Sequence, residues 1–111
     1  MTGEPLPFEI PPGMLASWRA EGREHAVLDV REPWEVAIAA LPDVIAVPMA
    51  EVPSHLAELP RDRPLVVLCH HGGRSARVTA WLRAQGLAGA TNLGGGIDAW
   101  ARDVDATVPT Y

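Results

Sequence analysis

The chain has 111 residues, a formal net charge of −5, and a hydrophobic content of 48%. This length suits one domain with a real core, and the apolar content excludes a disordered chain. The acidic balance argues against a nucleic-acid surface or an anionic-membrane surface as the partner.

Short apolar segments alternate with helical patterns along the chain. The expected strands cover residues 8–10, 26–30, 44–47, 65–68 and 90–93. Five helices are expected. The first carries Met14, Leu15 and Trp18 and stops at Gly22, and the second runs from Pro33 to Ala39. A weak helix over 52–59 is followed by one that carries Val78, Trp81 and Leu82 and stops at Gly86, and then by a short one over 97–102. Residues 1–12 are Pro-rich, and the tail 103–111 has no periodicity.

This alternation predicts a single α/β domain over residues 1–111, with its core at about 8–102. We expect a mainly parallel sheet of about five short strands with helices on both faces. No apolar run approaches the ~20 residues needed to span a bilayer. Met1–Pro5 lacks the basic and apolar regions of a signal peptide. We therefore expect a cytoplasmic protein that does not act at a membrane.

The residue types limit the chemistry. The single cysteine excludes an internal disulfide and a metal site built from several cysteines. All nine basic residues are arginines, which excludes a lysine nucleophile or Schiff base. One cysteine without a disulfide partner also fits a reducing compartment.

The reactive residue types gather directly after the strand at 65–68. Cys69 ends that strand, and the residues that follow it are His70, His71, Gly72, Gly73, Arg74 and Ser75. A glycine-containing turn before a helix N-terminus forms an anion-binding cup, because its amide N–H groups and the helix dipole point at one place. The same field favours thiolate over thiol. The pattern predicts a cysteine nucleophile at position 69.

Two further groups follow neighbouring strands. Asp29 and Arg31 lie at the end of the strand at 26–30, and Gly94–Gly96 follow the strand at 90–93. Because the carboxyl ends of parallel strands meet at one edge, where ligands bind, we expect both groups beside Cys69. Asp29 and Arg31 are expected to brace the strand end as an ion pair, and the glycines to leave room beside the loop.

His70 and His71 raise the question of a metal site. The side chains of adjacent residues are expected to diverge, and no third ligand is spaced to join them. We therefore expect no metal and no cofactor, and we expect the two histidines to shape the loop and tune access to it.

Four segments in the same order resemble the rhodanese (thiosulfate sulfurtransferase) family. They are the loop from Cys69 to Ser75, Asp29-Val30-Arg31-Glu32, the stretch from Leu41-Pro42 to Val47-Pro48, and Asn92-Leu93-x-Gly-Gly-Ile97-x-x-Trp100. The match runs from about Met14 to Trp100. Family members usually carry a His before the Leu-Pro pair and a Gly after it, where this chain has Ala40 and Asp43. This departure bears on the local turn.

The resemblance implies a rhodanese-like fold and a persulfide mechanism. Cys69 would take the outer sulfur of thiosulfate or of a low-molecular persulfide and pass it to cyanide, a thiol or a protein sulfur carrier. Backbone N–H groups of residues 70–75 would hold the terminal persulfide anion. Arg74 would bind an anionic donor, and Ser75 would cap the helix or contact the persulfide. Asp29 and Arg31 would support the loop.

Other functions stay open at this point. Cysteine phosphatases and arsenate reductases also place a Cys loop before a helix, but their arginine follows the cysteine by six residues. Arg74 follows Cys69 by five, and this shorter loop suits one sulfur atom better than a tetrahedral oxyanion. A non-catalytic interaction module is the second alternative, against which the intact cysteine loop argues. A relay fed by a cysteine desulfurase is not separated from thiosulfate chemistry by these residues.

Overall fold

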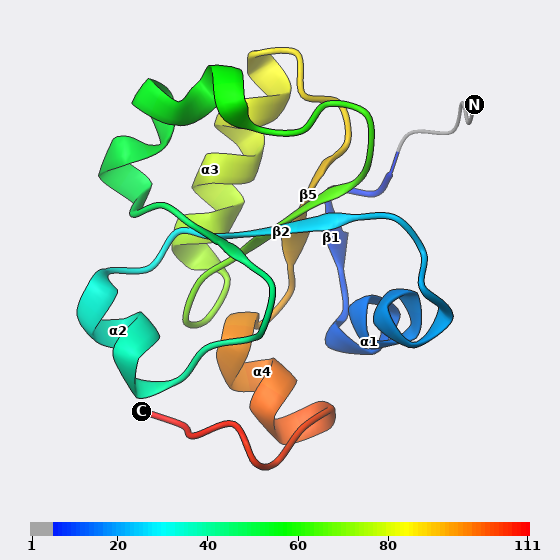
Figure 1. The fold of residues 1–111 in the computed structure, drawn as a ribbon, viewed down its shortest axis with the longest axis vertical. Helices are drawn as coiled ribbons and strands as arrows, with labels where there is room; N and C mark the ends of the chain where they lie inside the picture. The colour runs from blue at the N-terminus through cyan, green and yellow to red at the C-terminus, as the bar shows by residue number, and fades with distance from the viewer. Residues whose placement is uncertain (1–5) are drawn as a thin grey trace.

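The structure is a computed structural model that describes residues 6–111. Met1–Pro5 lie outside the described residues, and with them the first part of the predicted Pro-rich lead-in and the segment without signal-peptide features. Strands and helices alternate along the chain (Figure 1). In order they are β1 (Glu9–Ile10), α1 (Pro12–Glu21), β2 (Ala26–Asp29), α2 (Pro33–Ile38), β3 (Ile45–Ala46), η1 (Met49–Glu58), β4 (Leu65–Leu68), α3 (Gly73–Ala84), β5 (Ala90–Leu93) and α4 (Gly96–Asp103).

The five strands form one sheet in the order β1-β5-β4-β2-β3, and every neighbouring pair is parallel. The central strand β4 is buried along its whole length, as expected for an apolar strand that is covered on both faces. Its neighbours β2 and β5 end at the same edge of the sheet. The sheet therefore brings the residues after β2, β4 and β5 together, as the sequence predicts.

The core has two layers, one on each face of the sheet. Because side chains alternate along a strand, Leu65 and Val67 of β4 face one layer, and Val66 and Leu68 face the other. The first layer is completed by apolar side chains of η1 and α3, among them Val52, Val78 and Leu82. The second is completed by side chains of α1 and α4, among them Leu15, Trp18 and Trp100. Helices on both faces are thus confirmed (Figure 1).

The predicted weak helix over 52–59 is a longer 3₁₀ helix, η1, that begins at Met49. Pro53 lies inside it and has no backbone N–H to donate, which disfavours a continuous α-helical hydrogen-bond pattern. The observed strand β3 is also shorter than the predicted 44–47, because only Ile45 and Ala46 pair with β2.

In the family that the sequence resembles, a glycine usually stands at the position of Asp43. Asp43 adopts a φ of 58°, and it is the one non-glycine residue of positive φ within residues 6–111. Aspartate enters the left-handed region more readily than most side chains. The turn therefore keeps the backbone conformation that favours glycine, although the residue differs.

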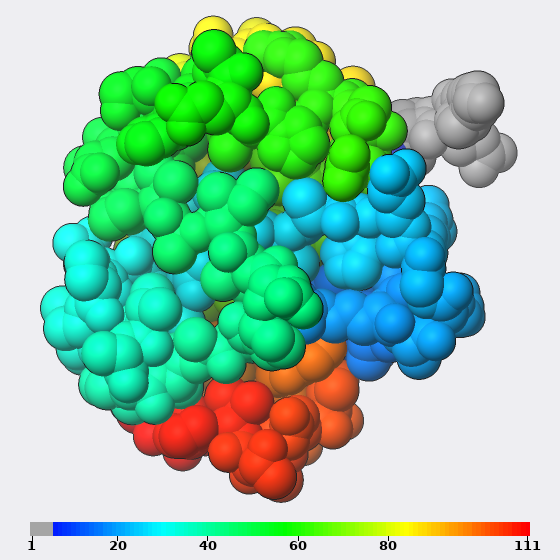
Figure 2. Space-filling model, in the orientation of Figure 1, coloured from blue at the N-terminus to red at the C-terminus, as the bar shows by residue number. Residues whose placement is uncertain are grey.

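The tail after α4 is irregular, as predicted, but it returns to the sheet edge. Figure 1 places the C-terminus beside α2, and Figure 2 shows the C-terminal segment packed against the region of α2 on this face. Val108 and Tyr111 pack against the second core layer. Within residues 6–111, no helix has the length and apolar character that crossing a membrane requires.

Candidate active site

The cysteine loop joins the end of β4 to the start of α3. Cys69 follows the last residue of β4, and α3 begins at Gly73. Gly72, the N-cap of that helix, has a φ of 102°, and a Cβ there would lie 3.2 Å from the Gly95 nitrogen. The positive φ and this close approach both favour glycine at this position. The tight turn places the sulfur of Cys69 in front of the helix N-terminus.

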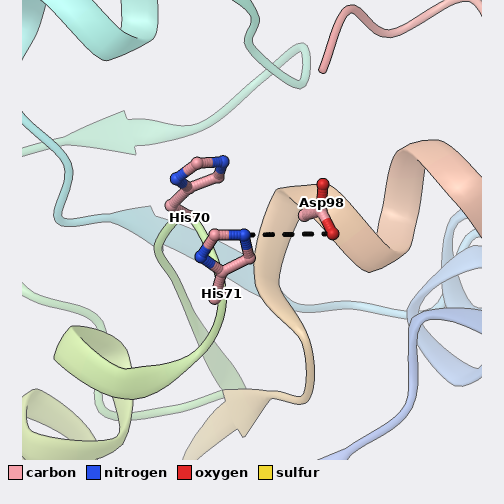
Figure 3. Close-up of side chains that lie close together, drawn as sticks. All are labelled: His70, His71 and Asp98. Atoms are coloured by element: carbon pink, nitrogen blue, oxygen red, sulfur yellow. Dashed lines mark ion pairs between the residues drawn. The ribbon is translucent and has the colours of Figure 1, made fainter. Parts of the chain in front are cut away.

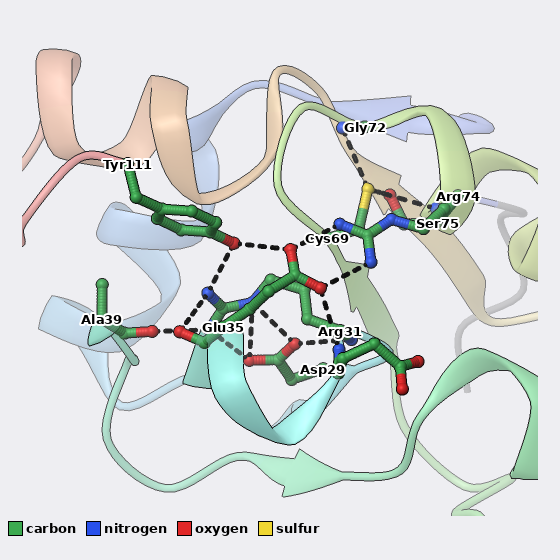
Figure 4. A network of polar contacts seen from close by, with 10 residues as sticks. Asp29, Arg31, Glu35, Ala39, Cys69, Gly72, Arg74, Ser75 and Tyr111 are labelled. Atoms are coloured by element: carbon green, nitrogen blue, oxygen red, sulfur yellow. Dashed lines mark hydrogen bonds and ion pairs between the residues drawn. The ribbon is translucent and has the colours of Figure 1, made fainter. Parts of the chain in front are cut away.

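Two backbone N–H groups and the Ser75 hydroxyl surround the sulfur of Cys69, a residue that is 1% exposed. The backbone N–H of Gly72 lies 3.1 Å from Sγ, the backbone N–H of Ser75 3.3 Å, and the Ser75 hydroxyl oxygen 3.2 Å (Figure 4). The two backbone N–H groups and the positive end of the helix dipole favour negative charge at this position. The predicted cup is therefore built mainly by the amides of Gly72 and Ser75.

A buried amide contacts the Ser75 hydroxyl from the other side. Asn92 donates from Nδ2 to the Glu9 carboxylate at 2.9 Å and to the Gly72 carbonyl at 3.3 Å. Because both partners can only accept, this fixes the amide so that Oδ1 faces Ser75 Oγ, which donates to it. Ser75 and Asn92 are at most 1% exposed. The hydroxyl thus has a fixed position beside the sulfur, and it does not cap the helix.

The start of α4 holds the carbonyl side of the loop. The backbone N–H of Ile97 donates to the Cys69 carbonyl at 2.9 Å, and that of Asp98 donates to the His70 carbonyl at 3.1 Å. Gly96 has a φ of 62°, and a Cβ there would collide with both carbonyls. The predicted role of the glycine run, leaving room beside the loop, is confirmed at this position.

Asp29 and Arg31 form the ion pair that the sequence predicts. Both side chains are buried, and Arg31 Nη2 lies 2.8 Å from Asp29 Oδ2. Arg31 also donates from Nε to Asp29 Oδ1 at 3.0 Å and from Nη2 to the Ala39 carbonyl at 2.7 Å. The guanidinium therefore joins the end of β2 to α2 and to Ala39, the residue after that helix, since it also contacts the Glu35 carbonyl.

Arg74 is held by a residue that the sequence analysis did not single out. Its guanidinium makes a two-bond ion pair with Glu35, with Nη1–Oε2 at 2.7 Å and Nη2–Oε1 at 2.8 Å (Figure 4). The Arg74 hydrogen bonds lower the pKa of Glu35 to about 2, and the same contact raises the pKa of Arg74. Both groups are charged over the whole neutral range.

Tyr111 completes this network from the tail. Its hydroxyl donates to Glu35 Oε1 at 2.9 Å and accepts from Arg31 Nη1 at 3.0 Å. Its ring stacks on His70 at a centroid distance of 3.8 Å, with an interplanar angle of 6°. The tail therefore contacts the cysteine loop through His70, and it contacts Arg31 and Glu35 at the sheet edge.

The two histidines of the loop are stacked rather than divergent, which corrects the expectation from their adjacency. Their ring centroids lie 3.8 Å apart at an angle of 24°, and Asp98 Oδ2 lies 4.0 Å from His71 Nε2 (Figure 3). Ligand atoms of all three residues are within 4.8 Å of one another, so a third candidate ligand does lie beside the pair. Burial, followed by the neighbouring His71, lowers the pKa of His70.

Comparisons with known proteins identify the family. The family model of the rhodanese-like domain matches residues 12–103. The chain belongs to this family. A sulfurtransferase of Allochromatium vinosum is 38% identical over 94 residues, which cover 85% of this chain and 88% of that protein.

Two further rhodanese relatives support the same assignment. The thiosulfate sulfurtransferase GlpE of Pseudomonas syringae is 31% identical over 91 residues, covering 82% of this chain and 84% of the relative. The crystal structure of a rhodanese-like domain protein from Staphylococcus aureus superposes with a TM-score of 0.80 at 28% identity, covering 93% of this chain and 97% of that one. The predicted rhodanese-like fold is confirmed.

Within this rhodanese-like domain, the sheet edge gathers the residues predicted from sequence and three that were not singled out. Cys69, the loop residues, Asp29 and Arg31 lie together, as expected. Glu35, Asn92 and Tyr111 complete the hydrogen-bond network. The position of Glu35 near the start of α2 and that of Asn92 in the closing motif could have indicated a role at the site. Tyr111 lies in a tail whose sequence has no pattern.

The ion pair of Glu35 predicts an acid sensitivity of the rhodanese-like fold. The pKa of Glu35 is about 2 in the folded chain against its ordinary 4.5. Between these two pH values, the Glu35 carboxylate therefore takes up a proton when the chain unfolds. The contribution of Glu35 to stability is complete above about pH 4.5 and is lost as the pH falls through about 2. Urea unfolding at a series of pH values should show a smaller acid loss in Glu35→Gln than in wild type. Glu51→Gln, an exposed control, should follow wild type; equal curves for all three proteins would refute the assignment.

Proposed function

We propose that this chain is a sulfurtransferase that carries sulfane sulfur as a persulfide on Cys69. The observation that carries the proposal is the cup of two backbone N–H groups, from Gly72 and Ser75, around the Cys69 sulfur. A thiolate in this position is activated as a nucleophile by its electrostatic surroundings. Family membership and the sulfurtransferase relatives support the same reaction class.

The first half-reaction loads the sulfur. The Cys69 thiolate attacks the outer sulfur of thiosulfate, a new S–S bond forms, and sulfite leaves with the electron pair of the broken bond. With a persulfide donor, the leaving group is the donor's thiolate. The product, Cys69–S–S⁻, carries its charge on the terminal sulfur. Amides of the loop then stabilise that charge, as an oxyanion hole stabilises an oxygen.

The second half-reaction unloads the sulfur onto an acceptor from outside the chain. Cyanide, a thiol or a protein sulfur carrier attacks the terminal sulfur, and Cys69 leaves as the thiolate. Because the chain has a single cysteine, no second thiol of its own can resolve the persulfide. We propose a reducing, cytoplasmic setting, which keeps the acceptor thiols reduced.

The other loop residues have positioning roles in this proposal. Gly72 supplies one amide and the backbone conformation that aims it, and Ser75 supplies the second amide and a hydroxyl held by Asn92. Gly73 opens α3, and Arg74 ties the helix start to α2 through Glu35. His70 and His71, stacked with Tyr111, shape the rim of the loop. The Asp29–Arg31 ion pair supports α2, because Arg31 donates to the carbonyls of Glu35 and Ala39.

A comparison of reaction classes tests this proposal. Wild-type protein should form thiocyanate from thiosulfate and cyanide with saturation in both substrates. It should hydrolyse an aryl phosphate no faster than the buffer does. The short loop suits one sulfur atom. Ser75 occupies the position at which cysteine phosphatases carry their phosphate-binding arginine. Aryl-phosphate hydrolysis at a rate comparable to thiocyanate formation would instead support the phosphatase alternative, and absence of both activities would support the interaction module.

A further inference from the structure

The positive charge of the cysteine loop, that of Arg74, is already paired with a carboxylate. The Arg74 guanidinium uses both terminal nitrogens on the Glu35 carboxylate, at 2.7 and 2.8 Å. Figure 4 shows this guanidinium turned toward the carboxylate, on the side of the loop where the Cys69 sulfur lies. A donor that arrives at the sulfur therefore meets an arginine whose charge is balanced by Glu35 and whose two terminal nitrogens each already donate to that carboxylate.

Glu35 is held so firmly that it does not release this arginine easily. Its side chain is 5% exposed, against 34% for that of Arg74. Besides the two bonds from Arg74, the carboxylate accepts the Tyr111 hydroxyl at 2.9 Å and the Glu32 backbone N–H at 2.9 Å. Moving the guanidinium to a substrate would leave a nearly buried carboxylate without its counter-charge, which is strongly unfavourable.

We infer that Glu35 is a specificity-determining residue: by binding Arg74 it withholds that guanidinium from the donor and biases the site toward persulfides over thiosulfate. The inference rests on the proposed persulfide chemistry of Cys69 and names its donor class. In a persulfide, R–S–S⁻, the single charge lies on the sulfur that is transferred, where the loop amides meet it. Thiosulfate carries further charge on sulfonate oxygens, which would need an additional cation.

The arrangement also changes the role expected for Arg74. The sequence predicts that Arg74 binds an anionic donor, whereas the structure pairs it with a carboxylate of α2. We therefore treat Arg74 as a positioning residue that fixes the start of α3. Removal of Glu35 should convert it into a donor-binding residue, which makes the inference testable as a gain of affinity.

The test compares two donors on wild type and Glu35→Gln. The donors are thiosulfate and a small alkyl persulfide whose organic part is uncharged, each with cyanide as acceptor. Glu35→Gln should lower the KM for thiosulfate by about tenfold, the size expected for one charge-assisted contact. The KM for the alkyl persulfide should change by less than about twofold. The thiosulfate KM of the variant should also depend more steeply on ionic strength.

Three further variants control this experiment. Tyr111→Phe removes one hydrogen bond from Glu35 without touching the ion pair, so it should shift the thiosulfate KM in the same direction by less. Glu35→Gln combined with Arg74→Ala should lose the gain. Arg77→Ala removes an arginine one turn further along α3, beside Met49 and Val52, and should leave the ratio of the two KM values unchanged.

The outcomes separate the inference from the proposed function. Equal changes in both KM values, or no change in the thiosulfate KM, would overturn the role of Glu35 while leaving the persulfide chemistry intact. If Glu35→Gln does not fold, an unchanged ratio in Tyr111→Phe would overturn it in the same way. A wild-type protein that takes sulfur from neither donor would refute the proposed function itself.

Discussion

Cys69→Ser is expected to reduce sulfur transfer by on the order of 10³-fold or more, with both thiosulfate and persulfide donors. A serine hydroxyl at this position is far less acidic than a thiol and cannot form a persulfide. The loop amides and the helix N-terminus stabilise an anion that the variant does not generate. Steady-state thiocyanate formation is the measurement.

The fold of Cys69→Ser should survive, which makes the loss of activity interpretable. Serine is slightly smaller than cysteine, and its oxygen can accept the same N–H groups of Gly72 and Ser75. Ser54→Ala, a surface change on η1, serves as the matched control and should keep full activity. Retention of most activity in Cys69→Ser would show that the nucleophile lies elsewhere.

Gly96→Ala is expected to have the largest effect on stability. The residue has a φ of 62°, and an added Cβ would collide with the carbonyl oxygens of Cys69 and His70. Those carbonyls accept the hydrogen bonds that attach α4 to the cysteine loop. We expect a loss of about 3 kcal/mol or more in the free energy of unfolding, from backbone strain and the displaced loop together. Thermal unfolding should show a fall in Tm of about 10 °C or more.

Gly13→Ala is the control for this substitution. Gly13 lies in α1, and a Cβ there would meet no atom within 4 Å. Because alanine favours a helix over glycine by about 1 kcal/mol, this variant should be neutral or slightly stabilised. A Gly96→Ala protein with the Tm of wild type would contradict the close packing of α4 against the loop.

Most of the fold could be predicted because its signals are local. The buried apolar strands and the Gly and Pro residues that end the helices are visible within a few positions, and the βα alternation then leads to a parallel sheet. The start of η1 at Met49 was not predicted, because Met49–Glu51 show no helical signal of their own, and their place in the helix depends on packing in the folded domain. The irregular tail was predicted, but its return to the sheet edge was not.

The candidate site divides in the same way. The cup around Cys69 was predictable because Gly72 and Ser75 lie within six residues of the cysteine. Glu35 lies 39 residues from Arg74 and 76 from Tyr111, and such pairs depend on the folded sheet rather than on sequence spacing. The ion pair of Arg74 could not be predicted for this reason, since only the structure reveals which carboxylate it meets.

The histidine pair illustrates a different limit. Adjacent side chains diverge in a regular strand, but His70 and His71 lie in a turn, where the backbone rotates both rings to one side. Asp98 then approaches from the first turn of α4. Neither the stacking nor the third neighbour could be inferred from the distance between these residues along the chain.

The most direct test of the central claim is the intact mass of the protein after incubation with a sulfur donor and removal of the excess. We expect wild type to gain the mass of one sulfur atom, to lose it on treatment with dithiothreitol or cyanide, and Cys69→Ser to gain nothing. An unchanged wild-type mass with both thiosulfate and a persulfide donor, or an equal gain in Cys69→Ser, would contradict the Cys69 persulfide.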